Sequence, residues 1–178
     1  MLLSERCKTL KETLSLKVID PERLEEKIAE MRALGKSIAS LNGSFDLLHA
    51  GHLEMLYQAS LQADVLIVAL NTDRSIQEYK SPLRPIIPLA ERLKLIASLF
   101  MVDYVTWFDE TDPRKILARI RPDVHVNGAE YGENCIEAQV VRSFGGKVQI
   151  VSLVEGLSTS QIIKKIVNTE TIRINEKH

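Results

Sequence analysis

The sequence has 178 residues, of which 45% are hydrophobic and 26% are charged, and its formal net charge is −1 at pH 7. A chain of this length and composition buries the core of one ordinary domain and is short for two. A net charge near zero gives no general attraction to nucleic acid or to an anionic membrane. We therefore expect neither of these partners, and any phosphate site must be local.

The start of the chain and the cysteines point to a cytoplasmic protein. No apolar run approaches the ~20 residues of a membrane helix, and the opening MLLSERCKTLKE becomes charged too early for a signal sequence. Cys7 and Cys135 lie far apart and in no CxxC or Cys/His pattern. We expect reduced thiols, with neither a disulfide framework nor a zinc site.

Short apolar runs alternate with segments of helical periodicity along the chain. Buried strands are expected at 37–41, 64–70, 103–108, 123–127 and 147–153. Helices are expected at 21–34, 51–62, 88–100, 113–120, 136–144 and 158–167. Several of these helices begin near a proline or end at a glycine, as helices commonly do.

Strands separated by helices indicate a parallel sheet that is covered on both faces. The predicted fold class is therefore α/β: a single doubly wound, Rossmann-like domain with a parallel five-stranded sheet. We expect this domain to span residues 21–167. An N-terminal extension at 1–20 and a polar C-terminal tail at 168–178 are the segments expected to fray.

The stretch GSFDLLHAGH, from Gly43 to His52, connects the first expected strand to the helix after it. Ligands of such folds bind at the carboxyl ends of the strands. Gly43 permits a tight turn, and the free amides at a helix start attract an anion. His49 and His52 share one side of the first helical turn, and Gly51 leaves room for a phosphate against the backbone. A phosphate would favour the charged imidazoles, which suits charge stabilisation.

Two other interpretations of the histidine pair stay open. An HxxH pair binds a metal ion only with a third ligand, for which His125 and His178 are the remaining histidines. Either member of the pair is also compatible with an ordinary core or surface position.

A second polar stretch, EGLSTSQIIKKI, places Ser158, Thr159 and Ser160 at the start of the last expected helix. Ser158 followed by Gln161 is the pattern of a capping box, which explains two of these residues by itself. Three hydroxyl groups at a helix start on the carboxyl edge of the sheet would also form a second anion site. Two facing anion sites fit a diphosphate or a triphosphate.

These stretches resemble the signature motifs of the cytidylyltransferase-like (HxGH) nucleotidyltransferases. Within that family the chain is most similar to the heptose adenylyltransferases of bacterial ADP-heptose synthesis. The resemblance covers about residues 21–167, with six blocks in the expected order: NGSFDLLHAGH, VALNTD, YKSPLRPIIPLAER, DYVTWFDE, RPDVHVNGAEY and LVEGLSTSQIIKKI.

The resemblance implies transfer of a nucleoside monophosphate, AMP in the favoured case, from a nucleoside triphosphate to a sugar phosphate. The implied acceptor is heptose 1-phosphate, the second product is pyrophosphate, and Mg²⁺ accompanies the triphosphate. In-line attack by the acceptor needs no covalent intermediate, so positioning and charge stabilisation carry the catalysis. The resemblance also implies a homodimer and, because the chain is too short to include a kinase, a separate sugar kinase that supplies the acceptor.

The resemblance assigns roles to residues at matching positions. His49 and His52 hold the α-phosphoryl group and the leaving phosphates, Thr159 binds the β- and γ-phosphates, and Lys80, in a flexible loop, neutralises charge. The implied nucleotide-binding residues are Asn42, Gly43, Ser44, Phe45, Gly51, Asn127, Gly128, Ser158 and Ser160. The acceptor-binding or phosphate-binding candidates are Asp46, Asn71, Asp73, Arg84 and Arg92. No residue is expected to be a metal ligand.

Several of these candidates have structural alternatives. Asp46 is expected to order its own turn through nearby backbone amides. Asn71 and Asp73 follow a strand, where a side chain commonly caps the next helix. Surface roles are the alternative for the cations Lys80, Arg84 and Arg92, the last as a partner of Glu91.

The block VNGAEY departs from the family pattern, which has a lysine and a second glycine where this chain has Asn127 and Ala129. The acceptor is therefore open, and a cytidylyltransferase acting on glycerol 3-phosphate or a similar polyol phosphate is the alternative enzyme. A nucleotide-binding regulator without catalysis and a metal-binding or scaffolding protein are the alternatives of other classes.

Overall fold

The computed structural model describes residues 9–129, 132, 134–151 and 158–175. It contains one sheet whose strands overlap the five predicted ones. They are β1 (Ile38–Gly43), β2 (Val65–Asn71), β3 (Tyr104–Phe108), β4 (Val124–Gly128) and β5 (Lys147–Val151). All neighbouring strands are parallel, in the order β3-β2-β1-β4-β5, so the predicted fold class is confirmed.

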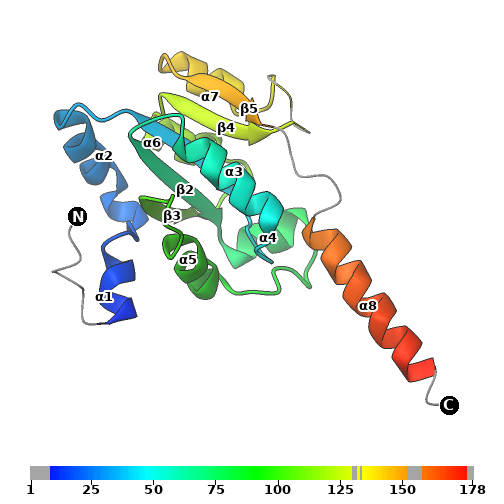
Figure 1. Cartoon of the computed structure of the whole chain (residues 1–178). Coiled ribbons are helices and arrows are strands. Elements are labelled where there is room, and N and C mark those ends of the chain that lie inside the picture. The colour runs from blue at the N-terminus through cyan, green and yellow to red at the C-terminus, as the bar shows by residue number, and fades with distance from the viewer. Residues whose placement is uncertain (1–8, 130–131, 133, 152–157, 176–178) are drawn as a thin grey trace.

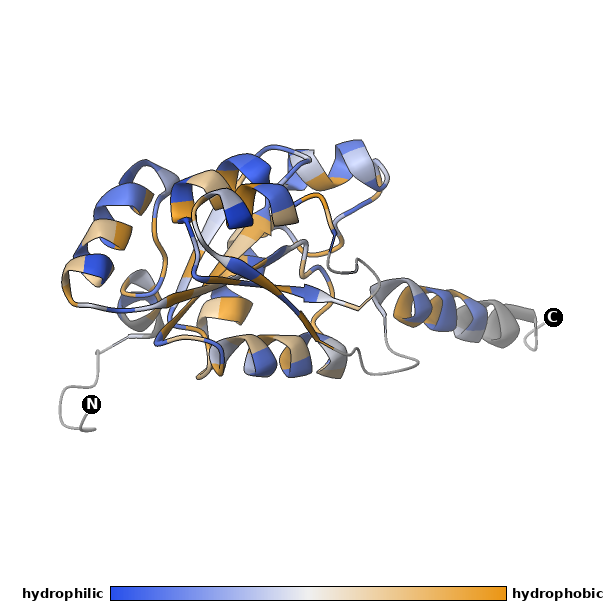
Figure 2. Cartoon of the chain, turned by 90° about the horizontal axis from the view of Figure 1, so that it is seen from above, coloured by the Kyte–Doolittle hydropathy of each residue, from blue (hydrophilic) through white to orange (hydrophobic). Residues whose placement is uncertain are grey.

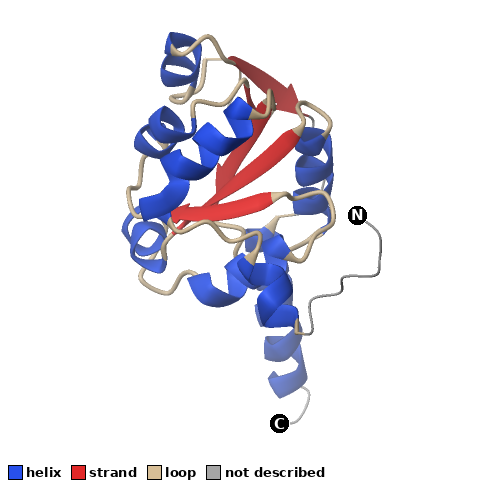
Figure 3. Ribbon diagram, turned by 90° about the vertical axis from the view of Figure 1, so that its left-hand side faces the viewer, coloured by secondary structure: helices blue, strands red, loops and turns tan. Residues whose placement is uncertain are grey.

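Helices cover both faces of this sheet (Figures 1 and 3). One face carries α1 (Leu10–Ser15), α3 (Ala50–Ser60) and α5 (Leu89–Ala97), and the other carries α2 (Leu24–Ala33) and α6 (Arg114–Ile120). The remaining elements are η1 (Pro21–Arg23), α4 (Asp73–Tyr79), α7 (Ala138–Ser143) and α8 (Thr159–Asn175). Among the described helices, none combines the length and the apolar character that crossing a membrane requires.

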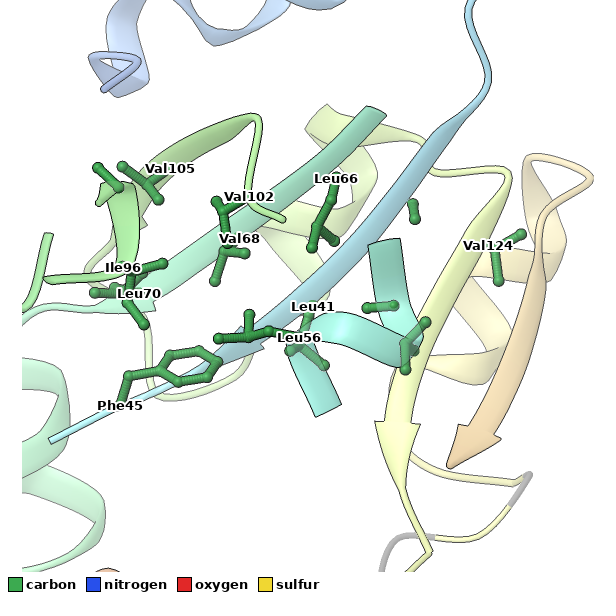
Figure 4. Close-up of a cluster of buried hydrophobic side chains, with 14 of the residues drawn as sticks. Leu41, Phe45, Leu56, Leu66, Val68, Leu70, Ile96, Val102, Val105 and Val124 are labelled. Carbon is green, nitrogen blue, oxygen red and sulfur yellow. The ribbon is translucent and has the colours of Figure 1, made fainter. Parts of the chain in front are cut away.

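Two clusters of apolar side chains, one on each face, hold these layers together. All residues of β2 are buried, as expected for a central parallel strand. Figure 4 shows the cluster on the α3 and α5 face, where Leu41 and Leu66 of the sheet pack near Leu56 of α3. Apolar residues, in orange, predominate along the strands, whereas the helices mix polar and apolar residues (Figure 2). Burial of this apolar surface is the main driving force for folding.

At the centre of the sheet, the pairing of β1 with β4 is shorter than its pairing with β2. β1 pairs with β2 as far as Gly43↔Leu70, whereas its pairing with β4 consists of Ala39↔Val124 and Ser40↔His125. The carboxyl ends of β1 and β4 therefore lie beyond their paired residues. This is also the point where the chain reverses its direction of travel across the sheet, which is the usual ligand site of such folds.

The last part of the predicted N-terminal extension belongs to the domain. Leu14 of α1 packs in one apolar cluster and Ile19 packs in the other. The amide of Ile19 donates to the carbonyl of Val105 at 2.8 Å, and Val18 forms a parallel bridge with the same residue. Anchoring by buried apolar side chains distinguishes this segment from a frayed terminus.

The final helix is longer than predicted, because α8 continues through Val167 to Asn175. The sequence from 158 to 175 contains neither proline nor glycine, so nothing in it stops a helix. Its polar composition fits a helix that extends away from the body of the domain, as α8 does in Figure 1. None of residues 158–169 is buried.

We predict that Leu14→Ala lowers the free energy of unfolding by about 2–4 kcal/mol, because the substitution leaves a cavity in the core. Leu14 is 6% exposed, whereas Leu16, two residues further on, is 66% exposed. Leu16→Ala is therefore the matched control and should change stability by less than about 1 kcal/mol. Urea unfolding of both variants provides the measurement, and equal effects would show that α1 does not belong to the core.

Candidate functional site

The loop between β1 and α3, residues 43–49, forms the floor of the site. Phe45 has a positive φ of 45° and a buried ring that packs in the core. A side-chain carbon at Gly43 would lie 3.3 Å from that ring, a distance to which the ring must yield. Glycine therefore lets the chain turn back over Phe45. We call this segment the phosphate loop.

The two histidines of the motif lie ring to ring at the end of the phosphate loop. Their ring centroids are 3.8 Å apart with an interplanar angle of 22°, and the ring of Phe45 lies 5.2 Å from that of His52. The Nδ1 atoms of both histidines are buried without a hydrogen-bond partner among the described residues. The structure thus brings His49 and His52 together as the motif predicts.

The stacked imidazoles are neutral at physiological pH. Burial lowers the pKa of His49. Burial also lowers the pKa of His52, to about 4, and the neighbouring His49 and Lys80 contribute in the same direction. A bound phosphate would act in the opposite direction, because a nearby negative charge favours the protonated form.

Helix α3 presents its amino end to the same site. His49 is the N-cap residue, and its carbonyl accepts hydrogen bonds from the amides of His52 and Leu53 at 2.9 and 3.2 Å. The amides of Ala50 and Gly51 remain at the open end of the helix, since the first turn has no acceptors for them. Together with the helix dipole, they favour an anion at this point.

Lys80 reaches the phosphate loop from the end of α4. Its ammonium donates a hydrogen bond of 2.8 Å to the hydroxyl of Ser44. Although the residue is exposed overall, desolvation of its ammonium lowers the pKa of Lys80, and Arg84 and Arg92 add to this effect. The structure therefore places this cation beside Ser44 and the histidines, at the end of α4 rather than in the expected flexible loop, and its role in neutralising charge stays a prediction.

Asp46 fastens the segment 81–88 to the phosphate loop. Its buried carboxylate accepts hydrogen bonds from the amides of Ile86 and Ile87 at 2.8 and 2.9 Å and from Arg84 Nε at 2.6 Å. Burial by itself would raise the pKa of Asp46, but these three donors outweigh it, so the pKa is lowered. The expected structural role therefore holds, although the amides come from a distant loop rather than from its own turn.

Arg92 occupies a different place from either of its predicted ones. Its side chain is 0% exposed, so the guanidinium reaches no surface. It donates to the carbonyls of Ser44 at 2.6 Å and Asn71 at 2.9 Å, and to Asp73 Oδ1 at 2.7 Å. Its Nε donates to the carbonyl of Ile87 at 2.9 Å. Arg92 therefore clamps the phosphate loop from inside the protein, and its hydrogen bonds go to these four groups rather than to Glu91.

The residue that caps α4 differs from the two candidates that the sequence suggested, Asn71 and Asp73. Thr72 is the N-cap residue, and its hydroxyl accepts a hydrogen bond from the amide of Ser75. Asn71 donates to the hydroxyl of Ser75, and Asp73 accepts from the amide of Leu89. Asn71 and Asp73 thus hold neighbouring segments in place, and neither of them caps the helix.

Buried polar atoms at the ends of β1 and β4 and at the start of α7 have no hydrogen-bond partner among the residues that the structure describes. They are Asn42 Oδ1, Asn127 Nδ2 and Glu137 Oε2. Asn127 and Gly128 end β4, and Glu137 immediately precedes α7. Glu137 was not predicted from the sequence, because it lies in no motif and only the fold brings it to this place.

The hydroxyl residues of the second motif begin α8 at the end of the molecule where α3 also begins (Figure 1). Ser158 Oγ accepts from the amide of Gln161 at 3.3 Å, as a helix cap does. No hydrogen bond within the described part of the chain joins Thr159 or Ser160 to the phosphate loop. The segment 152–157 lies outside the described residues, and a shared polyphosphate site remains a prediction.

A metal site at the histidine pair lacks a third ligand in the described ranges. These ranges contain no group of three His, Cys, Asp or Glu side chains that could hold a metal ion. His125 is buried between strands, where its Nδ1 lies 2.8 Å from the hydroxyl of Ser40. His178 lies outside the described residues.

Comparison with known proteins assigns the family. Residues 40–173 match the family model described as cytidylyltransferase-like. The chain belongs to the cytidylyltransferase-like family. The membership predicted from the motifs is therefore confirmed.

The relatives of the chain are longer proteins. It is 44% identical over 154 residues to the bifunctional protein HldE of Pseudomonas fluorescens (strain SBW25), which covers 86% of this chain and 32% of that protein. It is 40% identical over 154 residues to the bifunctional protein HldE of Citrifermentans bemidjiense, with the same two coverages. The chain thus spans about a third of the length of these curated relatives.

Solved structures share the fold. The lipopolysaccharide core biosynthesis protein from Thermoplasma volcanium GSS1 superposes with a TM-score of 0.55 at 28% identity, covering 67% of this chain and 98% of that one. The pantoate-beta-alanine ligase from Francisella tularensis also gives a TM-score of 0.55, at 15% identity, covering 86% and 77%. The second likeness concerns the fold alone.

We predict that Asp46→Asn lowers the free energy of unfolding by about 3 kcal/mol, because it breaks a buried, hydrogen-bonded ion pair with Arg84. Asp109→Asn is the matched control, since Asp109 pairs with Arg74 on the surface and both side chains are more than half exposed. The control should change stability by less than about 1 kcal/mol. Denaturant unfolding at neutral pH measures both, and similar losses would contradict the role given to Asp46.

We also predict that the imidazole of His52 titrates near pH 4 in the free protein, as measured by NMR. The pKa of His52 in the folded protein lies below the ~6.5 of an unfolded histidine. The neutral His52 side chain therefore contributes to stability above about pH 6.5, and this contribution is lost as the pH falls toward 4. Added nucleoside triphosphate should move the midpoint of His52 upward.

His125 is the control for this titration, because burial lowers its pKa to about 4 as well. Its ring lies inside the sheet beside Ser40, so added nucleotide should leave its midpoint unchanged. A His52 midpoint that ignores the nucleotide would separate this histidine from the phosphate site.

Proposed function

We propose that this chain is a nucleotidyltransferase that transfers AMP from ATP to the phosphate group of a sugar phosphate and releases pyrophosphate. The observation that carries this proposal is the convergence of two stacked imidazoles, the Lys80 ammonium and the open end of α3 on the phosphate loop. Phosphate oxygens are the ligands that such a set of donors and positive charge suits best. Family membership supports the same reaction class.

The proposed reaction is a single in-line displacement. A phosphate oxygen of the acceptor forms a bond to the α-phosphorus while the bond from that phosphorus to the bridging oxygen breaks. The bonding electrons leave with pyrophosphate, and no protein atom becomes covalently attached. The protein therefore contributes by positioning both reactants and by stabilising charge on the α-phosphoryl group and the leaving group.

Each residue of the phosphate site has a defined part in this reaction. A neutral imidazole has one N–H donor, so His49 and His52 each offer at most one hydrogen bond to the phosphates, and the backbone of Leu47 competes for that of His52. The approach of negative charge raises their pKa values, which strengthens these bonds as charge accumulates. Lys80 adds a cation that is already partly desolvated. Thr159 and Ser160 are proposed to bind the β- and γ-phosphates.

Magnesium is proposed to enter with the nucleotide. The buried carboxylate near the phosphate loop belongs to Asp46, and Arg84 and two backbone amides already occupy it. The residues around the loop therefore suit an ion held mainly by phosphate oxygens and water, which is the usual arrangement for Mg²⁺ in phosphoryl chemistry. The ion would neutralise phosphate charge there.

The acceptor is proposed to be heptose 1-phosphate, following the resemblance of the motif blocks, and Arg84 at the rim is proposed to assist its binding. We further propose that the protein acts in the cytoplasm as a homodimer and that a sugar kinase activity supplies the acceptor. The neutral Asn127, in place of the lysine expected there, keeps glycerol 3-phosphate with CTP as the competing pair to be tested.

A pyrophosphate-release assay tests the function directly. ATP, CTP, GTP and UTP are each combined with heptose 1-phosphate and with glycerol 3-phosphate in the presence of Mg²⁺. We expect ATP with heptose 1-phosphate to be the most productive pair. Turnover with CTP and glycerol 3-phosphate alone would replace the substrate assignment, and no turnover with any pair would refute the enzyme.

We predict that His49→Ala and His52→Ala each reduce kcat by about 10²–10³-fold, because each removes a donor that acts on the transition state. Tyr57→Ala, on an exposed position of the same helix, is the control and should retain nearly full activity. Far-UV circular dichroism establishes that the three variants are folded. Wild-type turnover in either histidine variant would remove that histidine from the mechanism.

A further inference from the structure

A cavity of about 330 Å³ lies at the ends of β2 and β3, on the side of the sheet where β3 is the edge strand. Its walls come from the first residue after β2, from the end of β3 with the loop that follows, and from one side of α6. None of the described residues that line it belongs to the phosphate loop. This volume is at the lower end of the range for ligand pockets and suits a molecule of about the size of one sugar ring.

The cavity is separate from the phosphate loop but adjoins it through the end of β2. The carbonyls of Ser44 and Asn71 both accept hydrogen bonds from the guanidinium of Arg92, at 2.6 and 2.9 Å. The end of β2 thus lies beside the phosphate loop, and Thr72, the residue after Asn71, lines the cavity. A ligand in the cavity can therefore extend one end toward the phosphates.

Hydrogen bonds fasten the loop after β3, which forms one wall of the cavity, to the end of β2. The carbonyl of Glu110 accepts from the hydroxyl of Ser75 at 2.7 Å and from the side-chain amide of Asn71 at 3.4 Å. The amide of Thr72 donates to the carbonyl of Phe108 at 2.9 Å. These contacts hold the wall through its backbone, so the side chain of Glu110 is left to act on a ligand.

Two of the charged side chains that line the cavity are already engaged by other residues. Arg119 donates to Glu25 Oε2 at 2.8 Å, and Asp109 accepts from Arg74 Nε at 2.9 Å. A cation that is held by a carboxylate has little attraction left for a phosphate group. Neither residue therefore makes this cavity a phosphate site.

The other two charged side chains, Glu110 and Lys115, form a loose pair that a ligand can use. Glu110 Oε1 and Lys115 Nζ are 3.4 Å apart, and their side chains are 38% and 79% exposed. An ion pair that is exposed in this way is weak, and its two charges balance. The carboxylate offers two acceptor oxygens and the ammonium offers donors, which suits a neutral group with adjacent hydroxyls.

Apolar side chains also line the cavity, namely those of Pro21, Phe108 and Ile116, of which the last two are buried. Trp107 is a further aromatic residue in the lining. Apolar surface combined with a few polar groups is typical of small-molecule sites. A sugar ring has the matching character, because its C–H faces are apolar and its hydroxyls lie around the edge.

We propose that this cavity binds the sugar ring of the acceptor, an inference that rests on the proposed function. Glu110 accepts hydrogen bonds from neighbouring ring hydroxyls, and Lys115 donates one to a hydroxyl oxygen. The phosphate of the acceptor then extends past the end of β2 to the phosphate loop. The cavity thereby selects an acceptor with a ring over the smaller glycerol 3-phosphate.

The fluorescence of Trp107 tests binding without turnover, because Trp107 lines the cavity and is the only tryptophan of the sequence. Heptose 1-phosphate, glycerol 3-phosphate and inorganic phosphate are each titrated in the absence and in the presence of a non-hydrolysable ATP analogue. We expect a saturable change with heptose 1-phosphate. Glycerol 3-phosphate should bind at least about tenfold more weakly, since it lacks the hydroxyls that Glu110 and Lys115 bind.

Substitutions at the loose pair connect this binding to the cavity. Glu110→Ala should raise the Kd and the KM of heptose 1-phosphate by about 10- to 100-fold, because hydrogen bonds to a charged group are lost, and Lys115→Ala should raise them by about tenfold. Glu110→Gln keeps one acceptor oxygen and should give an intermediate value. Glu91→Ala and Lys94→Ala remove an exposed pair of the same kind on α5 and should change neither quantity.

The outcomes separate the inference from the proposed function. Turnover of heptose 1-phosphate with wild-type KM values in folded Glu110→Ala and Lys115→Ala variants overturns the inference and leaves the function standing. A fluorescence change that the ATP analogue produces and that heptose 1-phosphate competes away assigns the cavity to the nucleotide and also overturns it. A saturable response to heptose 1-phosphate that Glu110→Ala weakens, without pyrophosphate release from any pair, supports the sugar site and refutes the reaction.

Discussion

The geometry of the phosphate loop depends on two buried charges that hold it from different sides. Arg92 binds the carbonyl of Ser44 from within the protein, and Asp46 binds the amides of the 81–88 segment. A buried charge is tolerated only when its hydrogen bonds are satisfied, so each residue requires its partners to keep their positions. The same contacts order the segment that follows Lys80, and the fold thereby fixes the loop and its nearest cation together.

The sheet could be predicted because the pattern of apolar residues that marks each strand lies within a short stretch of sequence and recurs along the chain. Each strand lies in a short stretch that contains Val, Ile or Leu, and alternation of these stretches with helical periodicity leaves a covered parallel sheet as the simplest arrangement. Residues 10–19 were not predicted to belong to the domain, because Leu14 and Ile19 make their contacts with residues far away in the chain. The length of α8 was underestimated, because a polar exposed helix and a polar tail have similar compositions.

Site residues could be predicted where a sequence motif fixes their spacing. They were harder to predict where contacts between distant segments determine their positions. The HxxH spacing and the helix start place His49 and His52 together, and the rings do stack. The role of Arg92 depends on carbonyls at the ends of β1 and β2, which no spacing in the sequence reveals. Glu137, at the start of α7, is buried by the packing of that helix and lies in no motif. Sequence reasoning thus brought His49 and His52 together but not the framework behind them, and the binding of phosphates by these residues stays a prediction.

Electrostatics explains why this framework has to be rigid. Lys80, Arg84 and Arg92 lie close enough together that the two arginines lower the pKa of Lys80, and the stacked histidines are held neutral by burial. Without a ligand this arrangement opposes folding, because like charges are brought together and polar rings lose their water. A polyphosphate reverses both effects at once, since its negative charge stabilises the cations and favours protonated imidazoles. The arrangement is therefore suited to the proposed anion, and the buried contacts of Asp46 and Arg92 offset the cost of keeping it in place without one.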